Sequence, residues 1–130
     1  MKHWVMAAVA VASVGTGASG ASAMAAAHKD GFAAFYKTFA AAIAKDDQPA
    51  LAGMVVLSPG LDDNDTPLTF AKFHHAALGP ASRRCLAKGG AVRNDNGDGT
   101  ASYAVTCDHT IYGFSRTKAG WRLTDLSPDD

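Results

Sequence analysis

Residues 100–126, TASYAVTCDHTIYGFSRTKAGWRLTDL, decide the fold class of this chain. Thr, Val, Tyr, Phe and Trp are frequent in this stretch and alternate with polar residues, which is typical of strands with one buried face. Short turn-forming segments interrupt the alternation, so the stretch predicts antiparallel strands joined by tight turns. The predicted strands are 100–109, 111–117 and 121–126.

The turn between the last two predicted strands fixes their alignment. A four-residue loop over Thr117–Gly120 pairs Arg116 with Trp121. Counting on along both strands pairs Phe114 with Leu123, whose side chains then face the same side of the sheet. We therefore expect a hairpin whose buried face includes this apolar pair.

A further strand is predicted over Arg83–Val92, ahead of the turn-forming run Asn94–Gly99. A hairpin centred near residue 96 places position 85 opposite position 107. Cys107 shares the apolar face of its strand with Tyr103 and Val105, because alternate side chains point to the same side.

The front half of the chain is predicted to be helical. Apolar residues recur every three or four positions between about His28 and Asp46, which predicts a helix with one apolar stripe. A second helix is expected from Pro49 through Val55, since proline suits the first helical position.

A third helix is expected after the polar loop Leu61–Asp65. Thr66 is its predicted N-cap and Pro67 its first residue, and Gly79-Pro80 ends it. Helices in front and strands behind predict an α+β domain with N-terminal helices packed on a curved antiparallel sheet. The tail Ser127–Asp130 is expected to be loose.

The N-terminal residues 1–23 have the three-part layout of a secretory signal peptide. A basic start is followed by an apolar run over residues 4–14, and Ala21-Ser22-Ala23 matches the A-x-A cleavage pattern. The run is too short to span a bilayer, which needs about 20 residues. We expect cleavage after Ala23, with Ala27 as an alternative site, and a periplasmic or secreted protein.

The remaining residues, 24–130, suffice for a single domain. Without Lys2, 11 basic side chains stand against 12 acidic ones, a formal charge of −1. Nucleic acid is not expected as a partner, because it requires clustered Lys and Arg and the one basic doublet is Arg83-Arg84. No second apolar segment is long enough for the membrane, so no membrane insertion is expected after signal cleavage.

The chain has two cysteines, Cys85 and Cys107. An even number of cysteines in an exported chain favours a disulfide, whereas two free thiols would be expected in the cytosol. The hairpin register places both on neighbouring antiparallel strands. The pair lacks the C-x-x-C spacing of redox enzymes, so the predicted bond is structural.

Six short patterns follow one another along residues 30–126: Phe35-Tyr36-x-x-Phe39-x-x-Ala42-Ile43-x-x-x-Asp47, Phe70-x-x-Phe73, Arg84-Cys85-Leu86-Ala87, Tyr103-x-Val105-x-Cys107, Tyr112-x-Phe114 and Gly120-Trp121-Arg122-Leu123-x-x-Leu126. Together they resemble a group of small exported bacterial proteins of poorly known function. Those proteins look like members of the cystatin-like cone fold shared by nuclear transport factor two and ketosteroid isomerase. One departure is Leu57-Ser58-Pro59, where an aromatic residue directly followed by proline is expected.

The resemblance implies a long helix and shorter helices packed in the concavity of a curved antiparallel sheet. It does not imply a function, because one fold hosts many functions. Ketosteroid isomerase-like enzymes use an Asp base and acidic hydrogen-bond donors, but the patterns do not map these positions onto residues of this chain, so none is carried over. Related cones often dimerise, so both a monomer and a homodimer stay open.

His74 is the most prominent polar candidate. On a helix it lies with Phe70 and Phe73 on the apolar face, whereas His75 points about 100° away. Two such neighbours cannot easily hold one metal ion, and a zinc site needs three or four ligands. His74 is interpreted first as a buried or cleft-edge histidine with a hydrogen-bond partner, and second as a residue lining a ligand pocket.

Other motifs favour structural interpretations. Asn94-x-Asn96-x-Asp98-Gly99 resembles the opening of a calcium loop, but Val105 stands where a bidentate Glu is required, so a hairpin turn is favoured. Ser58 and Ser115 have no base nearby in sequence, which gives nucleophilic catalysis no support. Phe114 and Trp121 are interpreted as core residues, and no metal or cofactor is expected.

The leading interpretation is a non-catalytic exported domain that binds a protein partner or a small ligand, as an inhibitor, an immunity-type protein or a scavenging module. The alternative is a small cone-fold enzyme of proton-transfer or hydrolytic type. In either case His74, Tyr36 and Asp108 are the candidate residues for the cone cavity. A deep pocket converging on two titratable groups favours the enzyme. A filled cone with an exposed apolar patch favours protein binding.

Overall fold

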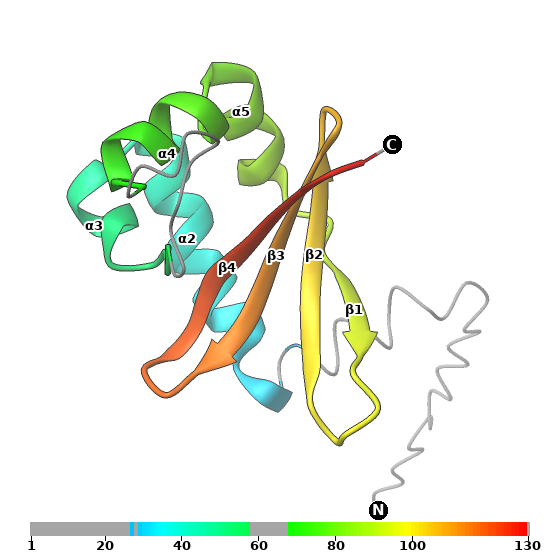
Figure 1. The fold of residues 1–130 in the computed structure, drawn as a ribbon. Coiled ribbons are helices and arrows are strands. Elements are labelled where there is room, and N and C mark those ends of the chain that lie inside the picture. The colour runs from blue at the N-terminus through cyan, green and yellow to red at the C-terminus, as the bar shows by residue number, and fades with distance from the viewer. Residues whose placement is uncertain (1–26, 28, 58–67, 130) are drawn as a thin grey trace, which may run out of the picture.

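The computed structural model describes residues 27, 29–57 and 68–129, in which helices come first and strands follow (Figure 1). This is the α+β arrangement that the sequence predicts. The predicted signal peptide and the polar loop over residues 61–65 lie outside the described residues. The elements are α2 (Phe32–Lys45), α3 (Gln48–Ala52), α4 (Phe70–Ala77), α5 (Pro80–Lys88), β1 (Val92–Asp95), β2 (Ala101–Cys107), β3 (Thr110–Thr117) and β4 (Gly120–Pro128).

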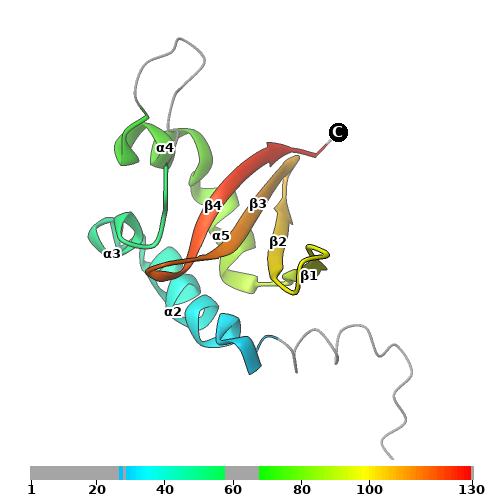
Figure 2. The same cartoon turned by 60° about the horizontal axis from the view of Figure 1, so that its bottom comes forward.

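The four strands form one antiparallel meander in the order β1-β2-β3-β4. The strands twist relative to one another, and the helices gather on one face of the sheet (Figures 1 and 2). On that face α2 packs against α5, and α5 packs against β2. The result is a two-layer domain with its core between the helices and the sheet.

The β3–β4 hairpin has the predicted register. Arg116 pairs with Trp121 and Phe114 pairs with Leu123. Phe114 and Leu123 are both fully buried. The prediction from turn length is therefore confirmed, including the apolar pair on the core face.

The predicted loose tail is wrong, because β4 continues to Pro128. A bulge between Gly113 and Phe114 shifts the register, after which Thr110 pairs with Pro128. The backbone N–H of Asp129 also donates to the carbonyl of His109 at 2.9 Å. Residues 127–129 are held in place because β3 and the preceding His109 supply their pairing partners.

The predicted strand over Arg83–Val92 is also wrong. Residues 80–88 form α5, and β1 covers only Val92–Asp95. Pro80 at the start of α5 has the φ angle that a first helical residue needs, and Ala, Arg, Leu and Lys in the segment are good helix formers. Gly89 ends the helix with a φ of 84°, which glycine adopts without steric cost.

The β1–β2 turn lies further along the chain than the sequence predicts. Asp95 pairs with Ala101, so the hairpin centres on Asp98 instead of residue 96. The carboxylate of Asp98 accepts hydrogen bonds from the backbone N–H and the hydroxyl of Thr100. The segment is thus the hairpin turn that the sequence favours, with its centre two residues further along the chain than predicted.

The first helix is confirmed over most of its predicted length, although Gly31, with a φ of 85°, delays its start. The second helix is shorter than predicted and ends at Ala52. Residues 54–56 instead follow the edge of the sheet, where Val55 bridges to Leu123 in parallel. Backbone pairing with β4 therefore replaces the last predicted helical turn.

The third helix also begins later than predicted. Its N-cap is Thr69, whose hydroxyl accepts a hydrogen bond from the backbone N–H of Lys72 at 3.2 Å, and its first residue is Phe70. Thr66 and Pro67, the predicted cap and first residue, lie outside the described residues. Thr69 offers the same side-chain acceptor three positions later.

An aromatic cluster joins α2 to the sheet. Phe114 is fully buried, and its ring lies 5.3 to 6.1 Å from four aromatic rings of α2. On the neighbouring strand, Tyr103 stacks on Phe32 with ring centroids 3.9 Å apart and planes at 3°. The face of the sheet that α2 covers is therefore filled by side chains. The α2 rings around Phe114 belong to Phe32, Phe35, Tyr36 and Phe39.

Candidate binding pocket at the turn end of the sheet

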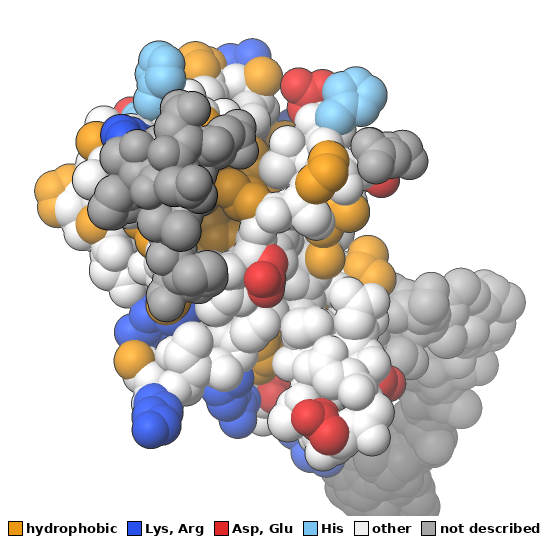
Figure 3. Space-filling model, in the orientation of Figure 1, with side chains coloured by type: hydrophobic (Ala, Val, Ile, Leu, Met, Phe, Trp, Pro, Cys, Tyr) orange, Lys and Arg blue, Asp and Glu red, His pale blue; other side chains and the backbone are white. Residues whose placement is uncertain are grey.

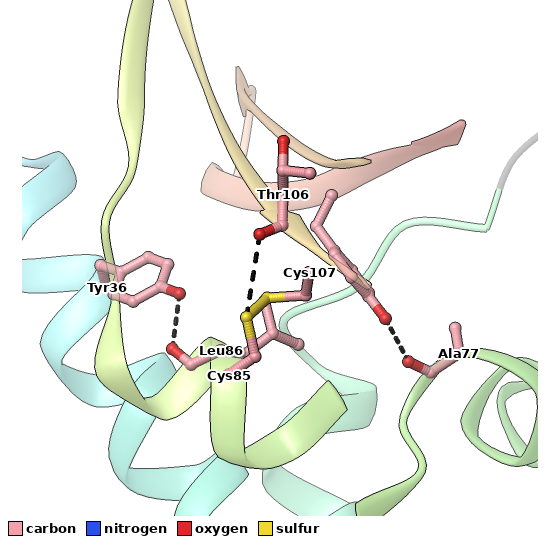
Figure 4. The surroundings of a disulfide bond; sticks show 7 residues. Tyr36, Ala77, Cys85, Leu86, Thr106 and Cys107 are labelled. Atoms are coloured by element: carbon pink, nitrogen blue, oxygen red, sulfur yellow. Dashed lines mark hydrogen bonds between the residues drawn. A yellow bond between two sulfur atoms is a disulfide. The ribbon is translucent and has the colours of Figure 1, made fainter. Parts of the chain in front are cut away.

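Tyr36 lies in the core between α2 and α5. Its hydroxyl donates a hydrogen bond to the carbonyl oxygen of Leu86 at 2.7 Å (Figure 4). Burial raises the pKa of the Tyr36 phenol well above its usual value of about 10. The side chain therefore acts here as a neutral donor that links two helices.

His74 forms a pair with Asp46 at the C-terminal end of α2. His74 Nε2 lies 2.7 Å from Asp46 Oδ1, and the side chains are 17% and 31% exposed. Arg83 adds a more distant contact, with Nη1 3.8 Å from Asp46 Oδ2, and donates to the carbonyl of Leu78 at 2.7 Å. The hydrogen bond with His74 is the main cause that lowers the pKa of Asp46. This cluster fastens α4 and α5 to the end of α2.

Asp108 lies in the exposed turn between β2 and β3. Both Asp108 and His109 have positive φ angles, 47° and 59°, as two-residue hairpin turns require. Their side chains are 77% and 91% exposed, with Asp108 Oδ1 3.9 Å from His109 Nε2. Asp108, His74 and Tyr36 thus contact different partners, and they do not meet in one site.

The disulfide between Cys85 and Cys107 is confirmed, but its place in the fold differs from the prediction. The bond joins α5 to the end of β2, with an S–S distance of 2.08 Å and a Cα–Cα distance of 5.9 Å (Figure 4). It does not cross neighbouring strands, because Cys85 is helical. Cys85 Sγ also lies 3.8 Å from the carbonyl oxygen of Thr106. A bonded sulfur carries no hydrogen, so this approach is a packing contact.

A cavity of about 610 Å³ lies at the end of the sheet that carries the β1–β2 and β3–β4 turns, and we call it the end pocket. Figure 3, drawn in the orientation of Figure 1, shows both basic and acidic side chains at this lower end of the molecule. The volume is in the range of small-molecule sites, about 300–1,000 Å³. His74, Tyr36 and Asp108 are not among its lining residues, which include Asp30, Arg93, Thr100, Arg116, Lys118 and Trp121.

Asp30 organises the floor of the end pocket. Its carbonyl oxygen accepts hydrogen bonds from Trp121 Nε1 at 2.9 Å and from the guanidinium of Arg116. Its carboxylate accepts from the backbone N–H of Phe32 at 3.0 Å and from the hydroxyl of Tyr103 at 2.7 Å. Burial is the main cause that raises the pKa of Tyr103 to about 12, and the hydrogen bond with Asp30 is the next. Asp30, two positions ahead of α2, therefore ties the start of the helix to β2, β3 and β4.

Trp121 forms one wall of the end pocket. The guanidinium carbon of Arg116 lies 5.1 Å from the centroid of its ring, within the range of a cation–π contact. Trp121 is also 7% exposed and packs edge-on against Phe32, with centroids 5.3 Å apart. The predicted core role of Trp121 is confirmed, and the same ring serves the pocket.

Further positive charge comes to the end pocket from Arg93 on β1 and from Lys118 in the β3–β4 turn. Arg93 Nη1 pairs with the exposed carboxylate of Asp95, which is the main cause that raises the pKa of Arg93. Arg93 Nε is shielded from solvent and has no hydrogen-bond partner among the described residues. Lys118 lies in the exposed β3–β4 turn and makes no ion pair within the described part of the chain.

The sequence analysis missed the end pocket because its walls come from three separated segments. Asp30 lies ahead of α2, Arg93 lies on β1 before one turn, and Arg116 and Lys118 lie at the end of β3 and in the turn that follows it. The available signal was the clustering of basic residues around two turns that an antiparallel meander brings to the same end. Using that signal requires the number and order of the strands, which the misassigned residues 83–92 obscured.

The described residues contain no group of three or more His, Cys, Asp or Glu side chains placed to hold a metal ion. In the same residues, no helix combines the length and apolar character needed to cross a membrane. The chain matches no family model, no curated protein and no solved structure. The architecture of the described residues is N-terminal helices packed on a four-stranded antiparallel meander.

Proposed function

We propose that this chain is an exported, non-catalytic binding domain of the cystatin-like cone architecture, and that its ligand site is the end pocket. The observation that carries the proposal is the contrast between two regions of the fold. Aromatic side chains fill the space between α2 and the sheet, whereas the end of the sheet that carries the β1–β2 and β3–β4 turns holds a cavity of about 610 Å³. A preformed cavity with a few polar groups around an aromatic wall is the usual form of a small-molecule site.

The enzyme alternative has less support from the geometry. His74, Tyr36 and Asp108 contact separate partners, so they do not form a pair of titratable groups facing one cavity. The carboxylate of the end pocket, Asp30, has both oxygens bonded to neutral donors. General acid–base catalysis needs a group that can exchange a proton with the substrate.

A small ligand is favoured over a protein partner by the distribution of apolar surface. The large apolar side chains that are exposed in the described part of the chain are Val56, Val92 and Leu126. Val92 lies on β1 and Leu126 on β4, which are opposite edges of the sheet. Protein interfaces are more often contiguous apolar patches. The proposal holds for a monomer and for a homodimer.

Export is supported by two independent features. The N-terminal residues 1–23 have the layout of a signal peptide. Both cysteines of the chain are joined in one disulfide, a bond that persists in oxidising compartments such as the periplasm or the extracellular space.

The binding role can be tested by blocking the end pocket. Ala101 lines the pocket at the start of β2, whereas Ala104 lies on the other face of the same strand. The experiment measures the melting temperature of wild type, Ala101→Phe and Ala104→Phe with a panel of small molecules of differing charge. The unliganded melting temperature of each variant is recorded first, to show that it folds.

We expect some compounds to raise the melting temperature of wild type and of Ala104→Phe, because a ligand that binds the native state stabilises it. The same compounds should leave Ala101→Phe unchanged. Equal responses of the two variants, or no response of wild type to any compound, would contradict the proposal.

A further inference from the structure

We infer that the end pocket takes a small organic molecule carrying an anionic group, a carboxylate or a phosphate; this inference rests on the proposed binding role of the pocket. Its lining contains the cations Arg93, Arg116 and Lys118 and the single carboxylate of Asp30, so 3 − 1 leaves a formal charge of +2. This differs from the whole chain, whose formal charge is zero. Positive charge is therefore concentrated at the cavity.

Asp30 does not neutralise these cations by direct pairing. Its two carboxylate oxygens accept hydrogen bonds from the N–H of Phe32 and the hydroxyl of Tyr103, both neutral donors. Its backbone carbonyl, not its carboxylate, accepts from Arg116. The carboxylate thus holds the start of α2 in place, and both of its oxygens are bonded to neutral donors and not to the pocket cations.

Arg93 is the best-placed donor for an anion. A guanidinium carries five N–H groups, and the described residues engage those of Arg93 incompletely. Nη1 pairs with Asp95 on the exposed side, while Nε is shielded from solvent without a partner. The Arg93 guanidinium lines the pocket, and an anionic oxygen there would accept from the outer N–H groups that Asp95 leaves open.

The β3–β4 turn supplies the second positive group. Lys118 is exposed at the pocket and has no acidic partner among the residues that the structure describes. The acid of the neighbouring turn, Asp98, is bonded to Thr100 instead. Arg116 is held over Trp121 and tied to Asp30, so it contributes a fixed charge.

The remaining walls indicate an organic anion in preference to a bare ion. Trp121 gives one apolar wall, while Thr100, Ser115 and Thr117 offer hydroxyl groups for other polar atoms of the ligand. The cavity of about 610 Å³ is much larger than a single phosphate or carboxylate group requires. A ring or short chain bearing one anionic group would use both kinds of wall.

The test uses four probes that share a phenyl ring and differ in charge. Isothermal titration calorimetry measures the binding of phenylphosphate, benzoate, benzyl alcohol and benzylamine to wild type, Arg93→Gln and Lys118→Gln. The matched control is Lys45→Gln, which removes an exposed cation at the opposite end of α2. Phenylphosphate and benzoate distinguish a phosphate ligand from a carboxylate ligand.

We expect at least one of the two acids to bind at least tenfold more tightly than the alcohol and the amine. Either pocket variant should weaken that binding at least tenfold, and Lys45→Gln should leave it unchanged. Added salt should also weaken it, since exposed charges are screened over about 10 Å at 0.1 M.

Two outcomes separate this inference from the proposal beneath it. If the alcohol or the amine binds as tightly as the acids and Ala101→Phe abolishes that binding, the pocket is a ligand site and the anion inference is wrong. Acid binding that both pocket variants leave intact also overturns the inference. If no probe of any charge binds, both the inference and the proposed function fail.

Discussion

Cys85 on α5 is bonded to Cys107 at the end of β2, and this bond fastens the last helix to the second strand. Cys107 is 1% exposed, so the bridge reaches into the core. It closes a loop with a sequence separation of 22 residues that contains β1 and the β1–β2 turn. The bond therefore restricts the helix, the edge strand and the turn beside the end pocket together.

Removing the bridge with Cys85→Ser and Cys107→Ser together should lower the free energy of unfolding by about 3 kcal/mol, the chain-entropy value for a loop of this length. The melting temperature should fall by roughly 10–20 °C. Far-ultraviolet circular dichroism below the transition should change little. Reductant should destabilise the wild type and leave the double variant unaffected. An equal effect on both would refute the stabilising role of the disulfide.

The centre of the aromatic cluster should be the most sensitive apolar position. Phe114→Ala should destabilise the fold by about 3–5 kcal/mol, because the ring is fully buried among four rings of α2. Leu126→Ala is the control, since Leu126 is 41% exposed and should cost much less. Chemical denaturation of both variants measures the difference, and similar costs would show that the cluster is not the core of the domain.

The pair formed by Asp46 and His74 should make stability depend on acid pH. The pKa of Asp46 is lowered in the folded state, first by its hydrogen bond with His74. The unfolded chain, with an Asp pKa of about 3.9, binds the proton more readily. The contribution of Asp46 is therefore complete above that pH and is lost as the pH falls through the lower folded-state value.

Denaturation of wild type and Asp46→Asn across the acid range measures this effect. We expect wild type to be the more stable near neutral pH, and the difference to shrink below about pH 4. In His74→Leu, nuclear magnetic resonance should find the pKa of Asp46 closer to its ordinary value. A difference that stays constant with pH would exclude Asp46 as its source.

The burial of Ala27 distinguishes the two predicted cleavage sites. Ala27 is 6% exposed and belongs to the core cluster, so cleavage after it would remove a packed residue. We expect exported protein to begin at Met24, after cleavage at Ala23. Mass spectrometry of the native N-terminus gives the answer, and an intact Met1 on exported protein would exclude a cleaved signal.

Local pairing could be predicted from the sequence, whereas competing local patterns and long-range contacts could not. The β3–β4 register follows from the length of one turn, and it is correct from Arg116 to Phe114. In Arg83–Val92 the residue types suit both a strand and a helix, and the signal that decides between them is Pro80, three residues upstream. The disulfide was predicted correctly from the count of cysteines, although the geometry assumed for it was wrong.

The candidate site was less predictable because its residues are far apart in the sequence and become neighbours only in the folded chain. The ring of His74 lies 5.9 Å from that of Phe70 on the same helix, as the predicted shared face implies, but its partner Asp46 is 28 residues away. Asp30, which organises the end pocket, has no motif that marks it. Its bonds to Tyr103 and Trp121 span 73 and 91 residues.

These separations also determine the order in which the domain can assemble. The meander, α5 and the disulfide all lie within residues 80–128, so their contacts close short loops, which favours fast formation. The aromatic stripe of α2 must instead reach strands many tens of residues away. During refolding, the amides of the C-terminal half should therefore acquire protection from hydrogen exchange first, leaving the stripe exposed to aggregation until α2 docks. Pulsed hydrogen exchange during refolding checks this order, and protection of α2 before the strands would reverse it.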